Sequence, residues 1–387
     1  MGLPKEFNFD PKRNQFSDLV TFLAVGTLLF KIPNIYFLQK FPAAKWPAAN
    51  VVCWGIATAC GPAAHNFQTI LVARVFLGIF EATVGPSLAI ISSQWYTKSE
   101  QAPRYSFWYL GVGMGQIIGG AISYGFQHVA PDANPSGWRI MFITLGVFTV
   151  LVGICVCIFI PDTPMQAAWL STVEKAALLK HVAANQTGIS NHKFHPRELL
   201  EAFLDPQMYC FFIANLGTSI SSGVVTTYSA TLIRGLLYDS KQAALMNMPS
   251  GAVGCFFTLL VGFGIRKGSN RWAWVLLCAG AALIGSGLMS FLPSTNKAGV
   301  LAGIYLVNAT IPALFVFYSW ALSNVAGATK RAFAAATVSA SFSLGNIIGP
   351  QTFRAQDAAS SYRSAKIFSM GGQAVCIVFT FILVSYY

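Results

Sequence analysis

The chain has 387 residues, of which 55% are hydrophobic and only 10% are charged. Soluble domains carry about 25% charged residues, so this composition excludes a protein whose whole surface faces water. The formal net charge is +12, but the lysines and arginines lie in short loops between apolar runs. That placement fits anionic lipid headgroups better than nucleic acid, so we expect a lipid bilayer and no nucleic acid as partners.

Apolar runs long enough to cross a bilayer recur along the whole chain. A spanning helix needs about 20 predominantly apolar residues, and about eleven segments meet this requirement. In chain order they are 17–38, 46–64, 69–93, 102–126, 138–160, 207–233, 242–265, 272–292, 298–322, 332–350 and 365–387. The sequence therefore predicts an all-α polytopic membrane protein.

One long polar stretch, 161–206, divides the apolar runs into two groups. It carries charges of both signs and nothing of catalytic character, so we interpret it as a solvated connector with some amphipathic helix. The predicted domains are an N-terminal transmembrane bundle at 1–160, the connector at 161–206, and a C-terminal transmembrane bundle at 207–387.

Each predicted bundle carries a ladder of small residues at four-residue spacing. The members are Gly111, Gly115 and Gly119 in the first bundle, and Ser341, Gly345 and Gly349 in the second. Four-residue spacing puts a ladder on one helix face, where another backbone can approach closely. Either ladder alone fits ordinary tight packing, but their repetition in both halves favours a transporter built from internal repeats.

Glu81 is the acidic residue that lies deepest within a predicted span. Burying a carboxylate in a membrane costs several kcal/mol unless it is paired or protonated, so Glu81 could load and release a proton. Arg74 lies seven residues earlier, which is nearly two helical turns, or about 10 Å along the same face. Gly78 lies between them and leaves room. A guanidinium grips carboxylates with two parallel hydrogen bonds, so the pair fits an anion clamp beside a proton acceptor, or else a structural ion pair.

Lys31 is a second cation within a predicted span. It could extend to the membrane surface, pair with Glu81, or contribute to a site for an anionic substrate, and the residues do not choose among these. Asn34 and Asn308 could supply polar contacts to a substrate, although packing explains each of them as well.

Several chemistries have no motif in the sequence. The eight cysteines and five histidines have no spacing that fits a metal site, and the bland interpretation of the cysteines is that they are reduced and lie in the core. No glycine-rich loop ends in Lys followed by Ser or Thr, so ATP-driven pumping is not expected. A membrane-embedded enzyme would need clustered acids or histidines at membrane depth. We expect no enzyme activity, no metal and no cofactor.

Several stretches carry a resemblance to a known family. They are RVFLGIFEA at 74–82, WRIMFI at 138–143, IPDTPM at 160–165 and GNIIGPQTF at 345–353. On these stretches the chain resembles the major facilitator superfamily, and more closely the fungal allantoate permease branch of the anion:cation symporters.

The resemblance implies a fold, a topology and an activity. It implies twelve spans in two six-helix halves, a cytosolic connector, and proton-coupled uptake of small carboxylates such as allantoate, nicotinate or pantothenate. In related organic-anion symporters, an Arg and a Glu seven apart on the fourth span bind substrate and couple protons, and Arg74 and Glu81 match them. The eleven visible spans correspond to the second through twelfth, so the family's first span is apparently missing. Lys31 stands where many relatives have an acid or an amide.

These observations combine into one functional hypothesis. We expect a monomeric, multi-pass plasma-membrane symporter of small organic anions that works by alternating access and is driven by the proton gradient. Arg74, Lys31, Asn34 and Asn308 would contact substrate, and Glu81 would carry the proton. The glycines of the two ladders would allow the helices to pack and move. The alternative is a nutrient sensor that does not transport, or a truncated, inactive paralogue of such a permease.

Overall fold

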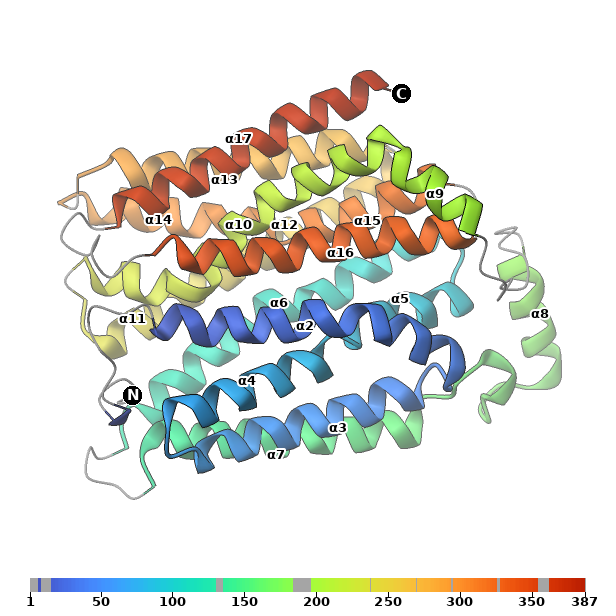
Figure 1. Cartoon of the computed structure of the whole chain (residues 1–387), viewed down its shortest axis with the longest axis horizontal. Coiled ribbons are helices and arrows are strands. Elements are labelled where there is room, and N and C mark those ends of the chain that lie inside the picture. The colour runs from blue at the N-terminus through green and yellow to red at the C-terminus, as the bar shows by residue number, and fades with distance from the viewer. Residues whose placement is uncertain are drawn as a thin grey trace.

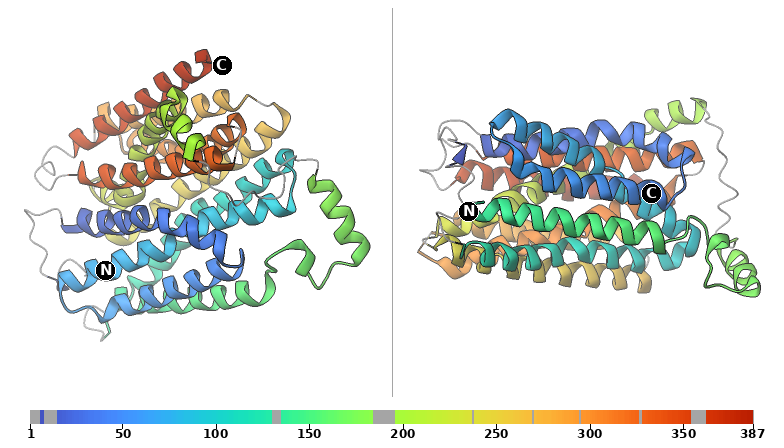
Figure 2. Two further views of the ribbon diagram at one scale, coloured as in Figure 1. Left: turned by 45° about the vertical axis from the view of Figure 1, so that its right-hand side comes forward. Right: turned by 90° about the horizontal axis from the view of Figure 1, so that it is seen from below.

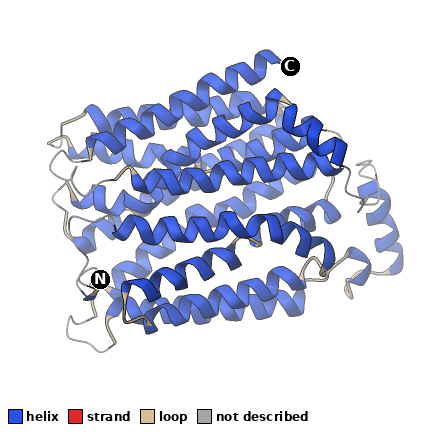
Figure 3. Cartoon of the chain, in the orientation of Figure 1, coloured by secondary structure: helices blue, strands red, loops and turns tan. Residues whose placement is uncertain are grey.

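A computed structural model of the chain contains helices joined by loops, with no strands in the part that it describes (Figure 3). The described residues are 6–7, 15–129, 135–183, 196–236, 238–268, 270–293, 295–325, 328–353 and 362–386. The first bundle consists of α2 (Gln15–Lys40), α3 (Lys45–Cys60), η1 (Gly61–Ala63), α4 (Phe67–Glu81), α5 (Val84–Trp95), α6 (Lys98–Phe126) and α7 (Gly137–Phe159).

The connector and the second bundle complete the chain. The connector holds η2 (Pro164–Gln166), α8 (Thr172–Ala183) and α9 (Pro196–Leu204). The second bundle consists of α10 (Pro206–Arg234), α11 (Ser240–Met246), α12 (Met248–Lys267), α13 (Arg271–Phe291), α14 (Lys297–Val307), η3 (Asn308–Thr310), α15 (Ala313–Asn324), α16 (Ala328–Gln351) and α17 (Arg363–Tyr386).

The two bundles lie side by side with their helices running in roughly the same direction (Figures 1 and 2). The connector projects from one end, where it follows α7 and precedes α10, and we call this the connector end and the opposite one the far end. Two helix pairs make the main contacts between the bundles, α6 with α12 and α2 with α16. Within the bundles the most extensive pairs include α10 with α16, α3 with α7, and α2 with α4.

All eleven predicted spans are helical, but three of them are broken rather than continuous. The segment 69–93 divides into α4 and α5, 242–265 into α11 and α12, and 298–322 into α14, η3 and α15. The prediction of continuous helices was wrong at these places. Apolar composition specifies membrane depth but does not report where the backbone departs from helical geometry, and Pro249 and Pro312 lie directly at two of the breaks.

Seven helical segments of the described chain are long and apolar enough to cross a membrane. They are Phe67–Leu88, Gly137–Phe159, Pro206–Arg234, Ser240–Lys267, Arg271–Phe291, Lys297–Asn324 and Arg363–Tyr386. The other predicted spans became α2, α3, α6 and α16. Three of these four, α2, α6 and α16, form the contacts between the bundles, so part of each helix surface faces protein rather than lipid.

The small-residue ladders differ between the two bundles. On α16, a side chain at Gly345 or Gly349 would collide with the backbone of α10, and Ser341 is fully buried against Asn215 of that helix, so the close approach predicted there is confirmed. On α6 the prediction was wrong. No atom of another described element lies within 4 Å of a Cβ built at the ladder positions Gly111, Gly115 and Gly119.

A different face of α6 carries the close contact between the bundles. A Cβ at Gly113 would lie 2.7 Å from the carbonyl oxygen of Gly251 on α12. About two helical turns further along α6, Gly120 faces Met248. The two backbones touch because neither has a side chain there. The sequence placed glycines on two faces of α6, and four-residue spacing selected the wrong face.

The cysteines are free, but most are not in the core. All eight lack a disulfide partner, and only Cys278 and Cys376 are buried, while Cys60, Cys155 and Cys157 are exposed. The last two lie on α7, a peripheral helix whose outer face consists of large apolar side chains. The prediction of core cysteines is wrong for these three, because apolar surroundings in a membrane protein include lipid.

Filling the α6–α12 contact should destabilise the protein. The change Gly251→Val places two methyl groups against the backbone of α6, and overpacking of this kind costs about 1–3 kcal/mol. We expect a melting temperature several degrees lower than that of the unaltered protein in a detergent-solubilised fluorescence melt. The matched change Gly111→Val, on the open face of α6, should leave the melting temperature nearly unchanged. Equal losses in the two variants would contradict the assignment of the contact face.

Candidate functional site

The break between α4 and α5 lies at membrane depth and is held by one amide. Asn34 of α2 is fully buried, and its Oδ1 accepts hydrogen bonds from Thr83 Oγ1 at 3.1 Å and Trp46 Nε1 at 3.0 Å. Its Nδ2 donates to the carbonyl oxygen of Ala82 at 3.5 Å. The break therefore has satisfied polar groups. The structure places Asn34 in this network, not on an open surface where it could receive a substrate.

Glu81 is the last residue of α4, directly before the break. Its carboxylate lies within electrostatic reach of Lys31 on α2 and Arg74 on its own helix. Neither cation forms an ion pair with it within 4.0 Å in the described structure. The structure thus brings together the three charged residues singled out by the sequence. Two cations lie near one carboxylate, and neither forms a close ion pair with it.

Close packing of α2 on α4 makes this grouping possible. A Cβ at Gly78 would lie 2.9 Å from the backbone nitrogen of Thr27, and Gly26 faces Val75 in the same way. The room expected beside Gly78 is therefore occupied by the backbone of α2. Since the two helices touch here, Lys31 is carried to the level of Glu81.

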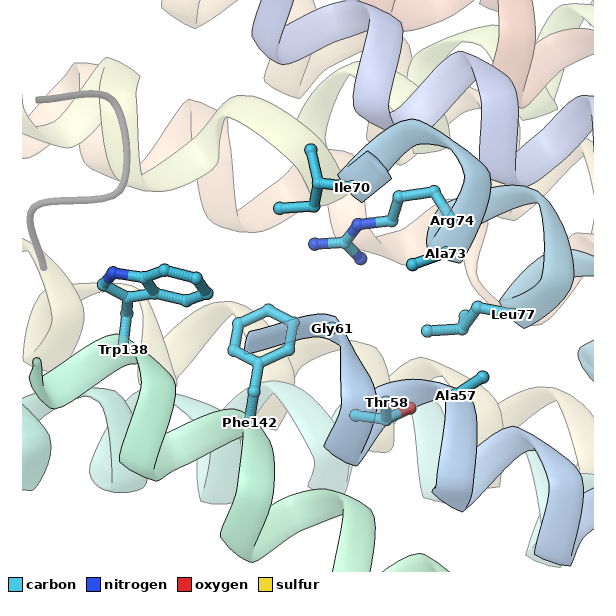
Figure 4. A pocket seen from close by; sticks show the side chains of 9 residues that line it. All are labelled: Ala57, Thr58, Gly61, Ile70, Ala73, Arg74, Leu77, Trp138 and Phe142. Carbon is cyan, nitrogen blue, oxygen red and sulfur yellow. The ribbon is translucent and has the colours of Figure 1, made fainter. Parts of the chain in front are cut away.

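Arg74 extends from α4 toward α7 (Figure 4). Its guanidinium carbon lies 5.4 Å from the centre of the Phe142 ring, a cation–π distance, and it shares a narrow hollow with Trp138, Ile70 and Leu77. The guanidinium is thus held on an apolar and aromatic floor. Its five N–H donors form a planar fork that suits a carboxylate.

Lys31 points across the interface between the bundles. Its Nζ donates to the carbonyl oxygen of Ser339 at 2.7 Å and to Ser343 Oγ at 2.6 Å, both on α16. Lys31 therefore does not extend to the membrane surface, which excludes one of the three alternatives left open by the sequence. Neither serine was singled out from the sequence, because a lysine carries no signal for a partner more than 300 residues away.

Asn308 occupies the corresponding place in the second bundle. It begins η3, the break between α14 and α15, and is 4% exposed. Its Oδ1 accepts a hydrogen bond from Gln116 Nε2 of α6 at 3.2 Å, so it too joins the two bundles. The Oε1 atom of Gln116 is buried and makes no hydrogen bond in the described structure. A polar group therefore remains available at this junction.

Further polar contacts close the interface at the far end. Ser17 of α2 hydrogen-bonds Tyr228 of α10 and donates to the carbonyl oxygen of Pro350 at 3.0 Å. Tyr228 stacks on Phe353 with ring centres 4.2 Å apart. Sequence analysis missed this group because its members lie in three helices, and just after one of them, at positions that are distant in the chain.

The connector is fixed to the first bundle at the connector end. Asp162 Oδ1 accepts from the backbone nitrogens of Ala44 and Lys45 at the start of α3. Glu100 accepts from Thr97 in a capping box and faces His181 of α8 at 3.2 Å. The backbone and hydroxyl of Thr97, with His181, lower the pKa of Glu100 to about 2, so this carboxylate stays ionised across the physiological range.

Comparison with known proteins places these features in a family. The Major Facilitator Superfamily model matches residues 3–350. A thiamine pathway transporter of Saccharomyces cerevisiae is 33% identical over 95% of this chain and 70% of its own length. Allantoate permease of the same yeast is 30% identical over 96% of this chain and 70% of its own.

Solved structures agree on the fold. The proton:xylose symporter XylE superposes with a TM-score of 0.74 at 16% identity, over 96% of this chain and 89% of that one. A bacterial homologue of the lysosomal transporter Spinster gives a TM-score of 0.65 at 18% identity, over 100% of this chain and 91% of that one. The family consists of transporters and not of enzymes. The chain belongs to the Major Facilitator Superfamily, in its fungal allantoate permease branch.

Proposed function

We propose that the protein is a proton-coupled symporter of small organic carboxylates that works by alternating access. The observation that carries the proposal is the position of Glu81, at a helix break within the membrane and between two cations from α2 and α4. Arg74 would hold the substrate carboxylate, and Glu81 would carry the proton. The driving force is the proton gradient, with no cofactor, and the site of action is the plasma membrane.

Electrostatics link the two roles. With Glu81 ionised, the three groups carry a net charge of +1, and with Glu81 protonated they carry +2. In a low-dielectric site that difference is large, so protonation strengthens the attraction for an anion. A proton and an organic anion are therefore expected to enter together, and neither crosses the membrane as an uncompensated charge.

The named relatives are consistent with two different solutes, and the site favours one. Allantoate is a carboxylate, which suits the guanidinium of Arg74. Thiamine carries a cationic ring, which Arg74 and the nearby Lys31 would repel, so the thiamine pathway relative does not change the proposed substrate class. A monomer suffices, because each copy holds both bundles.

An uptake assay distinguishes a symporter from the alternative, a non-transporting sensor or an inactive paralogue. Labelled allantoate, nicotinate and pantothenate are offered at pH 5 and pH 7 to permease-deficient yeast that carry a fluorescently tagged chain. Fluorescence at the cell periphery establishes expression and location. Uptake of one compound that is faster at pH 5 and lost with a protonophore supports symport. Absence of uptake from a well-expressed chain would favour the sensor or the inactive paralogue.

Glu81→Gln tests the proton-carrying role. The amide keeps the size and polarity of the neutral acid but cannot release a proton. We expect proton-driven accumulation to fall at least about tenfold, while exchange of labelled for unlabelled substrate continues, since exchange needs no net proton movement. Accumulation and counterflow in reconstituted vesicles measure the two activities separately. Equal loss of both would remove the coupling role from Glu81.

Arg74→Lys tests the anion clamp. A single ammonium cannot supply the planar fork of donors, so we expect the KM for the carboxylate to rise about tenfold or more at unchanged expression. Arg266→Lys, at the exposed end of α12, is the matched control and should transport normally. Normal kinetics in Arg74→Lys would show that Arg74 does not bind the substrate.

A further inference from the structure

Helices α2 and α16 are joined along a seam of hydrogen bonds that begins at the far end. Ser17 Oγ bonds the carbonyl oxygen of Pro350, and the Nε2 atom of Gln351 donates to Thr21 Oγ1 at 2.8 Å and to Asp18 Oδ1 at 3.1 Å. As residue numbers rise on α2 they fall on α16, so the helices run antiparallel. We call this set of contacts, together with those of Lys31, the α2–α16 seam.

Lys31 makes the last contact of this seam toward the connector end. It lies 14 residues after Ser17, about 21 Å along the helix axis. Beyond it the described side chains of α2 form no hydrogen bond with α16, and Figure 1 shows the connector end of α2 turning away from α16. Lys31 therefore sits where the two bundles begin to separate.

The Lys31 ammonium has acceptors on both bundles. Two of its three N–H donors reach α16, where Ser339 and Ser343 are 8% and 3% exposed. Glu81, on the other bundle, attracts the same ammonium. A buried cation is costly without partners. Lys31 therefore binds either the acceptors on α16 or Glu81 on α4, depending on which of the two attracts it more strongly.

Few other charges can interfere with this choice. The charges that act on Glu81 are Arg74 of its own helix and Lys31 of α2. The remaining charged residues of α2, Asp18 and Lys40, lie near its ends, and those of α16, Lys330 and Arg331, lie in its first turn, two or more turns before Ser339. Helix α5 has none, and the one charge of α3 is Lys45 at its first residue. The balance at Lys31 thus depends mainly on the ionisation of Glu81.

We propose that Lys31 is a latch that closes the α2–α16 seam when Glu81 is protonated and releases it when Glu81 is ionised. Ionised Glu81 competes for the ammonium and draws it toward α4, which frees Ser339 and Ser343. Protonated Glu81 leaves the ammonium on α16. The inference rests on the proposed proton-carrying role of Glu81, and it makes Lys31 a positioning residue for alternating access in place of a substrate ligand.

The test is a distance between the bundles, measured without substrate by pulsed electron spin resonance. Spin labels are attached at Lys45→Cys and Asn324→Cys, both exposed at the connector end, in a chain whose native cysteines are replaced. Lys31→Met keeps the length of the side chain and removes the latch. Loss of a charged hydrogen-bonding group should shift the ratio of long to short distances about tenfold toward the long ones. Ser343→Ala should shift it in the same direction by less.

Glu81→Gln distinguishes a latch from a simple clamp. It imitates the protonated acid, so it should increase the short distances in a chain that contains Lys31. In the Lys31→Met background it should have no effect, because the group that it releases is absent. An effect of the same size in both backgrounds would overturn the proposal.

Thr337→Val is the matched control on α16. Thr337 Oγ1 donates to the Phe333 carbonyl of its own helix, so its loss should not alter the distances. Unchanged distances in both Lys31→Met and Ser343→Ala, with a raised KM for exchange in Lys31→Met, would show that Lys31 only binds substrate. A failure of the unaltered protein to transport any carboxylate would refute the proposed function, while the distances would still report whether the latch exists.

Discussion

The structure depends on the cost of an unpaired polar group inside a membrane. An ammonium, a guanidinium and a carboxylate lie within predicted spans of the first bundle, where a charge without a partner is costly. Each is therefore accommodated by the protein. Lys31 binds acceptors on α16, Arg74 lies over Phe142, and Glu81 occupies a helix end between both cations. The positions of α2, α4 and α16 follow from this requirement, because only their close approach lets three charges share one region.

Helix breaks are the second consequence of the same constraint. A broken helix exposes backbone groups, and lipid cannot satisfy them. At the α4–α5 break Asn34 supplies the missing contacts, and at η3 the side chain of Asn308 bonds Ile304 and Gln116. One break lies midway along the α4–α5 segment of the first bundle, and the other lies midway along the α14–α15 segment of the second. At each break a side chain from a neighbouring helix forms a hydrogen bond. This correspondence extends the internal repeat, suggested by the two small-residue ladders of the sequence, to the helix breaks.

Much of the fold could be predicted from hydropathy, since every predicted span is helical. The family was identified from short stretches of sequence that resemble it. Hydropathy could not locate the helix breaks, because the hydropathy of a segment is the same whether its backbone is a regular helix or an interrupted one. Arg74 and Glu81 were found because seven-residue spacing is a local property of one helix. The partners of Lys31, and the contact of Ser17 with Tyr228, depend on how distant helices meet, which spacing does not encode. The glycines of α6 illustrate the limit, since two of its faces are small and only the tertiary structure shows that Gly113, not Gly111, meets α12.

The contact between Gly113 and Gly251 has a kinetic consequence. Where side chains interlock, one bundle can turn against another only if rotamers change and packed atoms separate, and both raise the barrier to motion. At the crossing itself the two glycines have no rotamers to reorganise, although the side chains of Cys255, Ile117 and Gln116 pack beside them. The α6–α12 contact can therefore serve as an axle, about which the bundles turn at little energetic cost. In the proposed mechanism the resistance to turning is then concentrated in the polar contacts of α2 with α16, where the proton on Glu81 would control it.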